Sequence, residues 1–448
     1  PGFGDVDERV TTDQTCHRNQ LLRNQNKSTV GRLRNTEYAT DFYESRSPWN
    51  FVDQIEVPTL LAASWQDEQV GSRSTRLMEQ FADDTMVRFV GLNGDHSAYL
   101  AALSDLIEFF SLYVKEESLA NDDRSYQEAL DAYESADPVK IYWELNQDNS
   151  PRFSTTYPEW PPGETWELYL RSGGALAADP PDESGRSSYE YVAPTTDEQT
   201  ISRDSNDRLQ WEQRDDGTYV SFVSERLDED HVCVGPGLVK LWLTSTADDT
   251  DLQVNLSEIR PDGEEIHVQE GWLRASHRAE DDQQSKPRRP FHTHRPEDQQ
   301  PLPDEFTEMR VELSPFAHIF RTDSRVRDSV SNNGGNRDLW AFDVLDETAT
   351  NEIAHSQSMP SKVELPLVPG ESTDTMRPDC GTVRNQPCRP VELPTVVEGP
   401  PKITGGDGAF RDVRGDGNFS ILDVQALFNN LDNPAVQDHA WAYNFSET

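Results

Sequence analysis

The sequence has few lysines and no long apolar run. Only seven of its 40 basic residues are lysines, and they face 82 acidic residues, so the 448-residue chain has a formal net charge of −42. Nucleic acid and anionic membranes would repel such a chain, and neither is expected as a partner. No apolar stretch approaches the roughly 20 residues that a membrane-spanning helix needs, so we expect no membrane span.

The acidic residues are spread along the whole chain rather than gathered in one tail. Ten tryptophans and periodic apolar segments accompany them, which favours folded domains over disorder. The length allows two to four domains. An acidic, lysine-poor surface resembles that of halophilic proteins, in which high salt screens the self-repulsion. An acidic secreted protein is the alternative.

Cysteine is scarce, and two of the four cysteines lie close together. Cys16 and Cys233 are isolated, whereas Cys380 and Cys388 stand near each other in a proline-rich segment. A disulfide between the close pair would imply an oxidising compartment, and two free thiols are the alternative. No zinc site is expected, because no second cysteine pair or nearby histidine accompanies them.

Strand and helix patterns alternate between residues 46 and 120. Residues 57–65 and 85–92 form short apolar runs that are typical of strands buried on both faces. Residues 74–82 and 104–117 carry apolar side chains at helical spacing, and in the second helix the apolar face comprises Leu106, Ile107, Phe110, Tyr113 and Val114. This order predicts a parallel βαβα unit.

The pattern changes after a connector at 121–137. From 138 to 370, short runs rich in β-branched and aromatic residues alternate with turn signals, such as the Pro-Asp-Gly at 261–263. We expect an all-β sandwich there. Residues 371–403 have little periodicity and are predicted to be a linker, followed by a small acidic module at 404–448.

Asp67 and His96 each follow a predicted strand of the parallel unit. Consecutive parallel strands end at the same edge of a sheet, so the two side chains should lie on neighbouring loops. A carboxylate that accepts from one ring nitrogen of a histidine fixes its tautomer and leaves the other nitrogen to act as a base. The order Asp then His matches the second half of an α/β-hydrolase triad.

Longer stretches strengthen this interpretation. The sequence from "RSPWNFVDQ" at 46 to "LYVKEE" at 117 resembles the end of the catalytic domain of the CocE/NonD serine hydrolases. That family includes cocaine esterase and Xaa-Pro dipeptidyl-peptidases. Residues 138–370, with "GWLRASHR" and "SKVELPLVPG", resemble the C-terminal jelly-roll domain of the same family. The resemblance implies that residues 1–45 are the tail of the helical cap.

The resemblance also implies roles. Asp67 and His96 correspond to the triad aspartate and histidine of a Ser-Asp-His hydrolase that cleaves an ester or amide bond, an Xaa-Pro dipeptidyl bond being one case. The substrate is then a small-molecule or peptide ester or amide. No Gly-x-Ser-x-Gly motif occurs in the sequence. In the family the nucleophilic serine precedes the cap, so we expect it outside this chain.

A calcium loop is predicted near the end of the chain, where "DVRGDGNFSILD" spans 412–423. It places glycine at position 6 and oxygen ligands at calcium-binding positions; the ligands are Asp412, Asp416, Ser420, Asp423 and the backbone carbonyl of Asn418. Arg414 replaces a usual ligand. The loop and the apolar helix after it resemble an incomplete dockerin module, which implies structural Ca²⁺, a cohesin-like or surface partner, and an extracellular or cell-surface location.

The sequence leaves two further alternatives open. His292 and His294 in "FHTHRP" could ligate a metal, but they lack a third ligand and are predicted to lie in a surface loop. The whole chain could instead be a non-catalytic cell-surface binding or adhesion protein that combines a β-sandwich with a calcium module.

Overall fold

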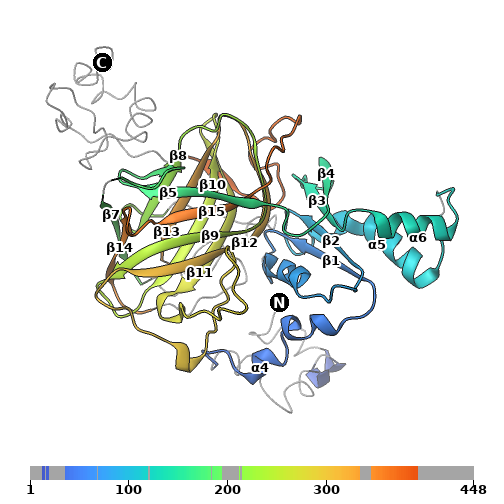
Figure 1. Cartoon of the computed structure of the whole chain (residues 1–448), viewed down its shortest axis with the longest axis horizontal. Helices are drawn as coiled ribbons and strands as arrows, with labels where there is room; N and C mark the ends of the chain where they lie inside the picture. Colours follow the sequence, from blue (N-terminus) through green and yellow to red (C-terminus); the bar gives the residue numbers. More distant parts are fainter. Residues whose placement is uncertain are drawn as a thin grey trace.

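The computed structural model describes residues 13–15, 17–19, 36–67, 69–119, 122–182, 184–193, 211, 214–332 and 345–391. These residues form a four-stranded sheet with helices beside it and a larger β domain (Figure 1). None of the helices in this part of the chain is long and apolar enough to cross a membrane.

The first sheet has the order β1-β2-β3-β4, formed by β1 (Thr59–Ser64), β2 (Val87–Leu92), β3 (Val139–Trp143) and β4 (Phe153–Tyr157). β1 pairs with β2, and β2 with β3, in parallel, whereas β4 is antiparallel to β3. The predicted parallel unit is therefore confirmed. The sheet extends beyond it, however, because β3 and β4 lie after residue 138, where the sequence pattern had suggested that the β-sandwich begins.

The helical segments of this half are short. Within the described residues from 36 on, they are α4 (Asp41–Glu44), η1 (Pro48–Asn50), η2 (Val52–Gln54), η3 (Ser72–Glu79), η4 (Ala98–Ala102), α5 (Leu103–Phe110), the π-helical η5 (Ser111–Lys115) and α6 (Tyr126–Ser135). The helix predicted at 74–82 is the 3₁₀-helix η3, and the one predicted at 104–117 is α5 followed by η5. α6 begins with a capping box between Ser125 and Glu128.

The apolar face predicted for α5 is not the buried one. Ile107, Phe110 and Val114 are about half exposed or more, whereas Phe109 and Leu112 are buried. Helical spacing alone identifies an apolar stripe but does not say what covers it.

The β domain forms one hydrogen-bonded network. In the described residues its strands are β5 (Glu164–Arg171), β6 (Ala175–Ala177), β7 (Gly185–Tyr191), β8 (Tyr219–Ser224), β9 (His231–Ser245), β10 (Asp251–Ile259), β11 (Glu264–Arg274), β12 (Thr307–Phe320), β13 (Arg325–Ser331), β14 (Ala349–His355), β15 (Lys362–Leu367) and β16 (Cys388–Pro390). Their order is β16-β11-β10-β13-β8-β6-β5-β15-β9-β14-β7, and β12 pairs with β9. The short turns η6 (Ala275–His277) and η7 (Pro296–Asp298) lie between β11 and β12.

The β domain folds back on itself, because β12 is hydrogen-bonded to β9 and also packs across β11. The predicted all-β region is thus found, and the Pro-Asp-Gly turn joins β10 to β11 as an antiparallel hairpin. The predicted linker is wrong up to Val391, since β16 pairs with β11.

One apolar core joins the two halves. Trp65 and Phe89 of the first sheet belong to the same buried cluster as Phe316 and Leu365 of the β domain. The opposite face of the first sheet has a smaller core around Leu92 and Tyr142. Apolar side chains on both faces of β2 therefore anchor the loop that follows it.

Candidate functional site

Asp67 lies in the loop after β1, close to buried residues. Trp65 continues the strand pairing through its backbone N–H, which donates to the carbonyl of Leu92 at 2.8 Å. Its indole ring packs over Gly91, where a Cβ atom would collide with it. Asp67 is buried, and its Oδ1 accepts the backbone N–H groups of Gln69 at 2.8 Å and Val70 at 3.0 Å. These hydrogen bonds fix the carboxylate.

His96 lies in the loop after β2, and the two loops are bonded to each other. Gln66 donates its backbone N–H to the carbonyl of Gly94 at 3.2 Å, and its Oε1 accepts the Gly94 N–H at 3.0 Å. Gly94 has a φ of +130°, which favours glycine. The paired loops bring Nδ1 of His96 to 2.9 Å from Oδ2 of Asp67.

The structure therefore brings together the two residues that the sequence placed in one site. Asp67 is 6% exposed as a residue, while 47% of the His96 side chain is exposed. A buried carboxylate that receives Nδ1–H selects one tautomer and stabilises the imidazolium. Nε2 is then the ring nitrogen that can take up and release a proton. The arrangement is suited to general base catalysis on a group near the protein surface.

Asp95 and Ser97, on either side of His96, were not identified from the sequence. Asp95 accepts from the backbone N–H of Ser97 at 2.9 Å, from its hydroxyl at 2.7 Å, and from Nη2 of Arg384 at 2.9 Å. Burial raises the pKa of the Asp95 carboxyl, but the hydrogen bonds from Ser97 and Arg384 outweigh burial and lower it below the usual range. The only sequence signal near Arg384 was the spacing of Cys380 and Cys388.

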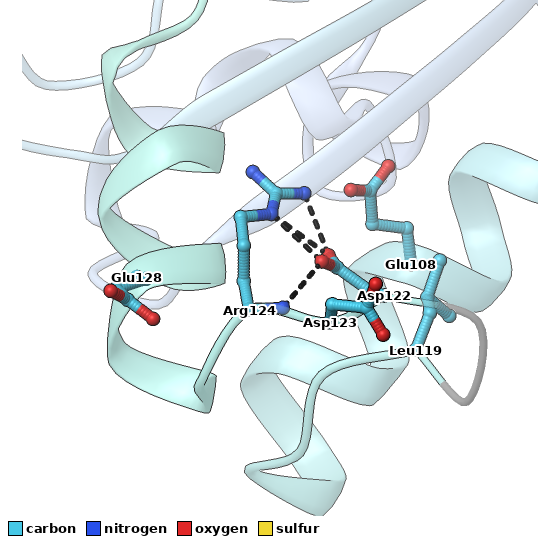
Figure 2. A pocket seen from close by; sticks show the side chains of 6 residues that line it. All are labelled: Glu108, Leu119, Asp122, Asp123, Arg124 and Glu128. Atoms are coloured by element: carbon cyan, nitrogen blue, oxygen red, sulfur yellow. Dashed lines mark hydrogen bonds and ion pairs between the residues drawn. The ribbon is translucent and has the colours of Figure 1, made fainter.

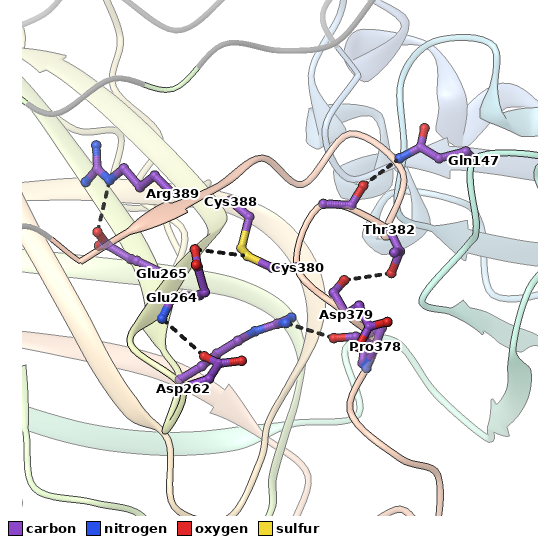
Figure 3. The surroundings of a disulfide bond; sticks show 12 residues. Gln147, Asp262, Glu264, Glu265, Pro378, Asp379, Cys380, Thr382, Cys388 and Arg389 are labelled. Atoms are coloured by element: carbon purple, nitrogen blue, oxygen red, sulfur yellow. Dashed lines mark hydrogen bonds and ion pairs between the residues drawn. A yellow bond between two sulfur atoms is a disulfide. The ribbon is translucent and has the colours of Figure 1, made fainter.

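Cys380 and Cys388 form a disulfide, with their Cα atoms 5.7 Å apart. This outcome selects one of the two alternatives that the sequence left open. Figure 3 shows the bond beside Glu264 of β11. The potential ligand atoms of Glu264 and the two cysteines lie within 4.8 Å of one another, but the sulfur atoms are bonded to each other and are not available as thiolate ligands.

Other candidates lie elsewhere or outside the described residues. His292 and His294 are in a loop, and neither belongs to a metal-ligand group within the part of the chain that the structure describes. The predicted calcium ligands, together with Arg414, are outside the described residues, so the calcium site stays a prediction; they are Asp412, Asp416, Asn418, Ser420 and Asp423.

A surface hollow lies between α5 and the start of α6. Figure 2 shows its lining, which includes Glu108 and Glu128 and an ion pair between Arg124 and Asp122 at 2.7 Å. Neither Asp67 nor His96 lines it. Asp122 is paired with Arg124, and Glu128 accepts from Ser125 in the capping box of α6, so we assign the hollow no role.

This chain is similar to known proteins in sequence and in structure. Residues 134–333 match the family described as the X-Pro dipeptidyl-peptidase C-terminal non-catalytic domain. Proteins of Mycobacterium bovis and Mycobacterium tuberculosis, each named "Putative serine esterase", are 27% identical to this chain over 240 residues. The match covers 49% of this chain and 36% of each relative, so the chain spans about a third of their length.

Solved structures share the fold. A CocE/NonD family hydrolase from Staphylococcus aureus superposes with a TM-score of 0.60 at 21% identity, covering 80% of this chain and 62% of that one. An alpha-amino acid ester hydrolase gives 0.55 at 18% identity, with the same two coverages. An aminopeptidase from a Thaumarchaeota archaeon gives 0.56 at 16% identity and covers 74% and 58%. The matched domain, the esterase relatives and the shared fold together support a relationship to the CocE/NonD-type hydrolases.

Proposed function

We propose that this chain supplies two members of the catalytic triad of a serine hydrolase that cleaves an ester or amide bond. The observation that carries the proposal is the hydrogen bond of 2.9 Å between His96 Nδ1 and Asp67 Oδ2, at the carboxyl ends of two parallel strands. The nucleophile would be a serine outside these 448 residues. The names of the mycobacterial relatives favour an ester as the substrate.

In the proposed reaction, Nε2 of His96 takes the hydroxyl proton as the serine oxygen bonds to the carbonyl carbon. Asp67 accepts Nδ1–H and stabilises the resulting imidazolium. His96 then gives the proton to the leaving alcohol or amine as its bond to the carbonyl carbon breaks. Water repeats the sequence on the acyl-enzyme and releases the acid.

The β domain supplies neither of the two proposed triad residues. Its matched family is described as non-catalytic, which is compatible with placing both proposed triad residues on the first sheet. The disulfide supports an oxidising compartment outside the cytoplasm.

The test compares the 448-residue chain with a longer protein that also contains the segment in which the serine is proposed to lie. The chain alone should not hydrolyse p-nitrophenyl acetate, because the base has no serine to activate. The longer protein should hydrolyse it and be inactivated by a serine-reactive phosphonate.

In the longer protein, His96→Ala and Asp67→Asn should each lower kcat by a factor on the order of 10³ or more, because triad members act as a unit. Circular dichroism should show that both variants remain folded. Near-native turnover by either variant, or phosphonate-sensitive turnover by the 448-residue chain, would contradict the proposal.

A further inference from the structure

The segment that closes the described part of the chain forms a disulfide loop, residues 380–388. Its base is attached to the β domain, because Cys388 is the register partner of Ile266 in β11. The carbonyl of Pro387 accepts the N–H of His267 at 3.0 Å, and Nε2 of Gln386 donates to the carbonyl of His267 at 3.0 Å. These bonds hold the C-terminal arm of the loop against β11, and the disulfide ties the N-terminal arm to it. Figure 3 shows the disulfide next to Glu264 of β11.

The tip of the disulfide loop reaches the first sheet. Arg384 donates its backbone N–H to the carbonyl of Leu145 at 2.7 Å and Nη1 to the carbonyl of Gln147 at 3.0 Å. The carbonyl of Arg384 accepts from Nδ2 of Asn93 at 3.1 Å. The residue is thus bonded to the segment after β3 and to the end of β2, and its side chain is only 17% exposed.

The tip also bonds the two loops that carry the proposed catalytic residues. Nη2 of Arg384 lies 2.9 and 3.1 Å from the carboxylate oxygens of Asp95 and 2.8 Å from the hydroxyl oxygen of Ser97. Nδ2 of Asn385 donates to the carbonyl of Gln66 at 2.9 Å. The residues on both sides of His96 and the residue before Asp67 are therefore held by two neighbouring residues of one loop.

The disulfide closes the loop at its base. Gly381 and Asn385 both have positive φ angles, of 75° and 54°, and glycine and asparagine are the residues that adopt this region most readily. A short loop closed by a disulfide has few conformations available in the unfolded chain, so its native shape costs less entropy to form. Opening the disulfide would remove the constraint at the base of the loop. The hydrogen-bonding groups of Arg384 and Asn385 at the tip would be chemically unchanged.

We infer that Arg384 and Asn385 are positioning residues for the Asp67–His96 pair. The Cys380–Cys388 disulfide makes this positioning sensitive to an external dithiol, which is oxidised to its disulfide as the two cysteines become thiols. The catalytic part of this inference rests on the proposed function. The effect of Arg384 and Asn385 on the geometry of His96 can be measured in the 448-residue chain without any turnover.

The first experiment uses the 448-residue chain labelled with ¹⁵N-histidine. The Nδ1–H proton of His96, assigned by its loss in His96→Ala, should be visible by NMR because Asp67 accepts it. In Arg384→Gln its exchange with water should be roughly tenfold faster, as expected when a charge-assisted hydrogen bond that holds the loop is lost. Arg384→Lys should fall between the two, because lysine keeps the charge but cannot bond Asp95 and Ser97 in the same geometry.

The matched control is Arg377→Gln. Arg377 precedes the disulfide loop in the same segment and bonds the Thr322 carbonyl and the Ser324 hydroxyl in the β domain, both at about 3 Å. Its loss should leave the His96 signal unchanged. Reduction, or the double substitution Cys380→Ser with Cys388→Ser, should accelerate exchange as Arg384→Gln does. Wild-type exchange in both Arg384→Gln and the double variant would overturn the inference, and so would the absence of the signal in the wild-type chain.

The second experiment measures ester hydrolysis by the longer protein that also contains the proposed serine. Arg384→Gln should lower kcat about 10- to 100-fold, as expected for misplacement of a catalytic group, while KM changes by less than about twofold. If the parent protein is inactive, the proposed function fails and the NMR experiment alone decides the positioning. If the parent is active and Arg384→Gln keeps its kcat, the positioning role in catalysis is wrong.

Discussion

Asp67 and Asp328 are both buried aspartates, and their surroundings differ in one respect that decides their chemistry. Asp67 accepts two backbone N–H groups and faces His96. Asp328 lies in the middle of β13, with Leu256 and Phe222 as its register partners on either side, both fully buried. Among the described residues, no hydrogen-bond donor reaches either of its carboxyl oxygens.

The difference shows that hydrogen-bond donors decide whether a buried carboxyl is suited to catalysis. The backbone N–H groups that donate to Asp67 replace the water lost on burial. The buried carboxylate can therefore act as the hydrogen-bond acceptor for His96. Without donors, burial raises the pKa of Asp328 to about 8, and the residue is a neutral acid at lower pH. The first environment is suited to catalysis, whereas the second only lowers stability at neutral pH.

The largest expected effect is on the pH dependence of stability. The pKa of Asp328 in the folded chain lies above its ordinary value of 3.8, so the unfolded chain loses the proton first as pH rises. The free energy of unfolding should therefore fall between about pH 4 and pH 8. Asp328→Asn should remove this slope and gain several kcal/mol at pH 8, at about 1.4 kcal/mol for each pKa unit of the shift.

Chemical denaturation at several pH values measures that gain. The control is Asp328→Glu, which keeps the titrating group and should keep the slope. A wild-type chain and an Asp328→Asn variant with parallel pH profiles would show that Asp328 has donors after all, and the contrast with Asp67 would disappear.

A smaller effect on stability is expected from removal of the Cys380–Cys388 disulfide. Replacing Cys380 and Cys388 together by serine should lower the free energy of unfolding by about 2 to 3 kcal/mol, the loss expected when a loop of about nine residues is opened in the unfolded chain. Denaturation with and without a reductant checks this, because reduction should affect the wild-type chain and leave the double variant unchanged. An equal response of both proteins would contradict it.

The smallest effect should come from Asp67→Asn in the 448-residue chain. The remaining amide oxygen can still accept from Gln69 and Val70, so the free energy of unfolding should change by about 1 kcal/mol or less. The same substitution should thus have different consequences at the two sites: a large gain in stability at Asp328 and little change at Asp67. A loss of several kcal/mol at Asp67 would mean that its main role is structural.

Much of the first sheet was predictable, because β1 and β2 are short apolar runs that can be recognised from neighbouring residues in the sequence. β1 and β2 appear within the ranges that the sequence indicated, and the parallel order placed Asp67 and His96 at one edge. The extent of the sheet was missed. β3 and β4 are β-rich like the domain that follows, and composition does not reveal which sheet a strand joins.

The sequence by itself determined that Asp67 and His96 would meet, because two strands in succession and their connecting helix specify the topology locally. It could not determine what holds them. Arg384 is 289 residues from Asp95, and no periodicity marks a loop whose shape comes from a disulfide and from backbone bonds to β11. Only the packing of the β domain against the first sheet, through one shared core, decided that this loop would reach the site.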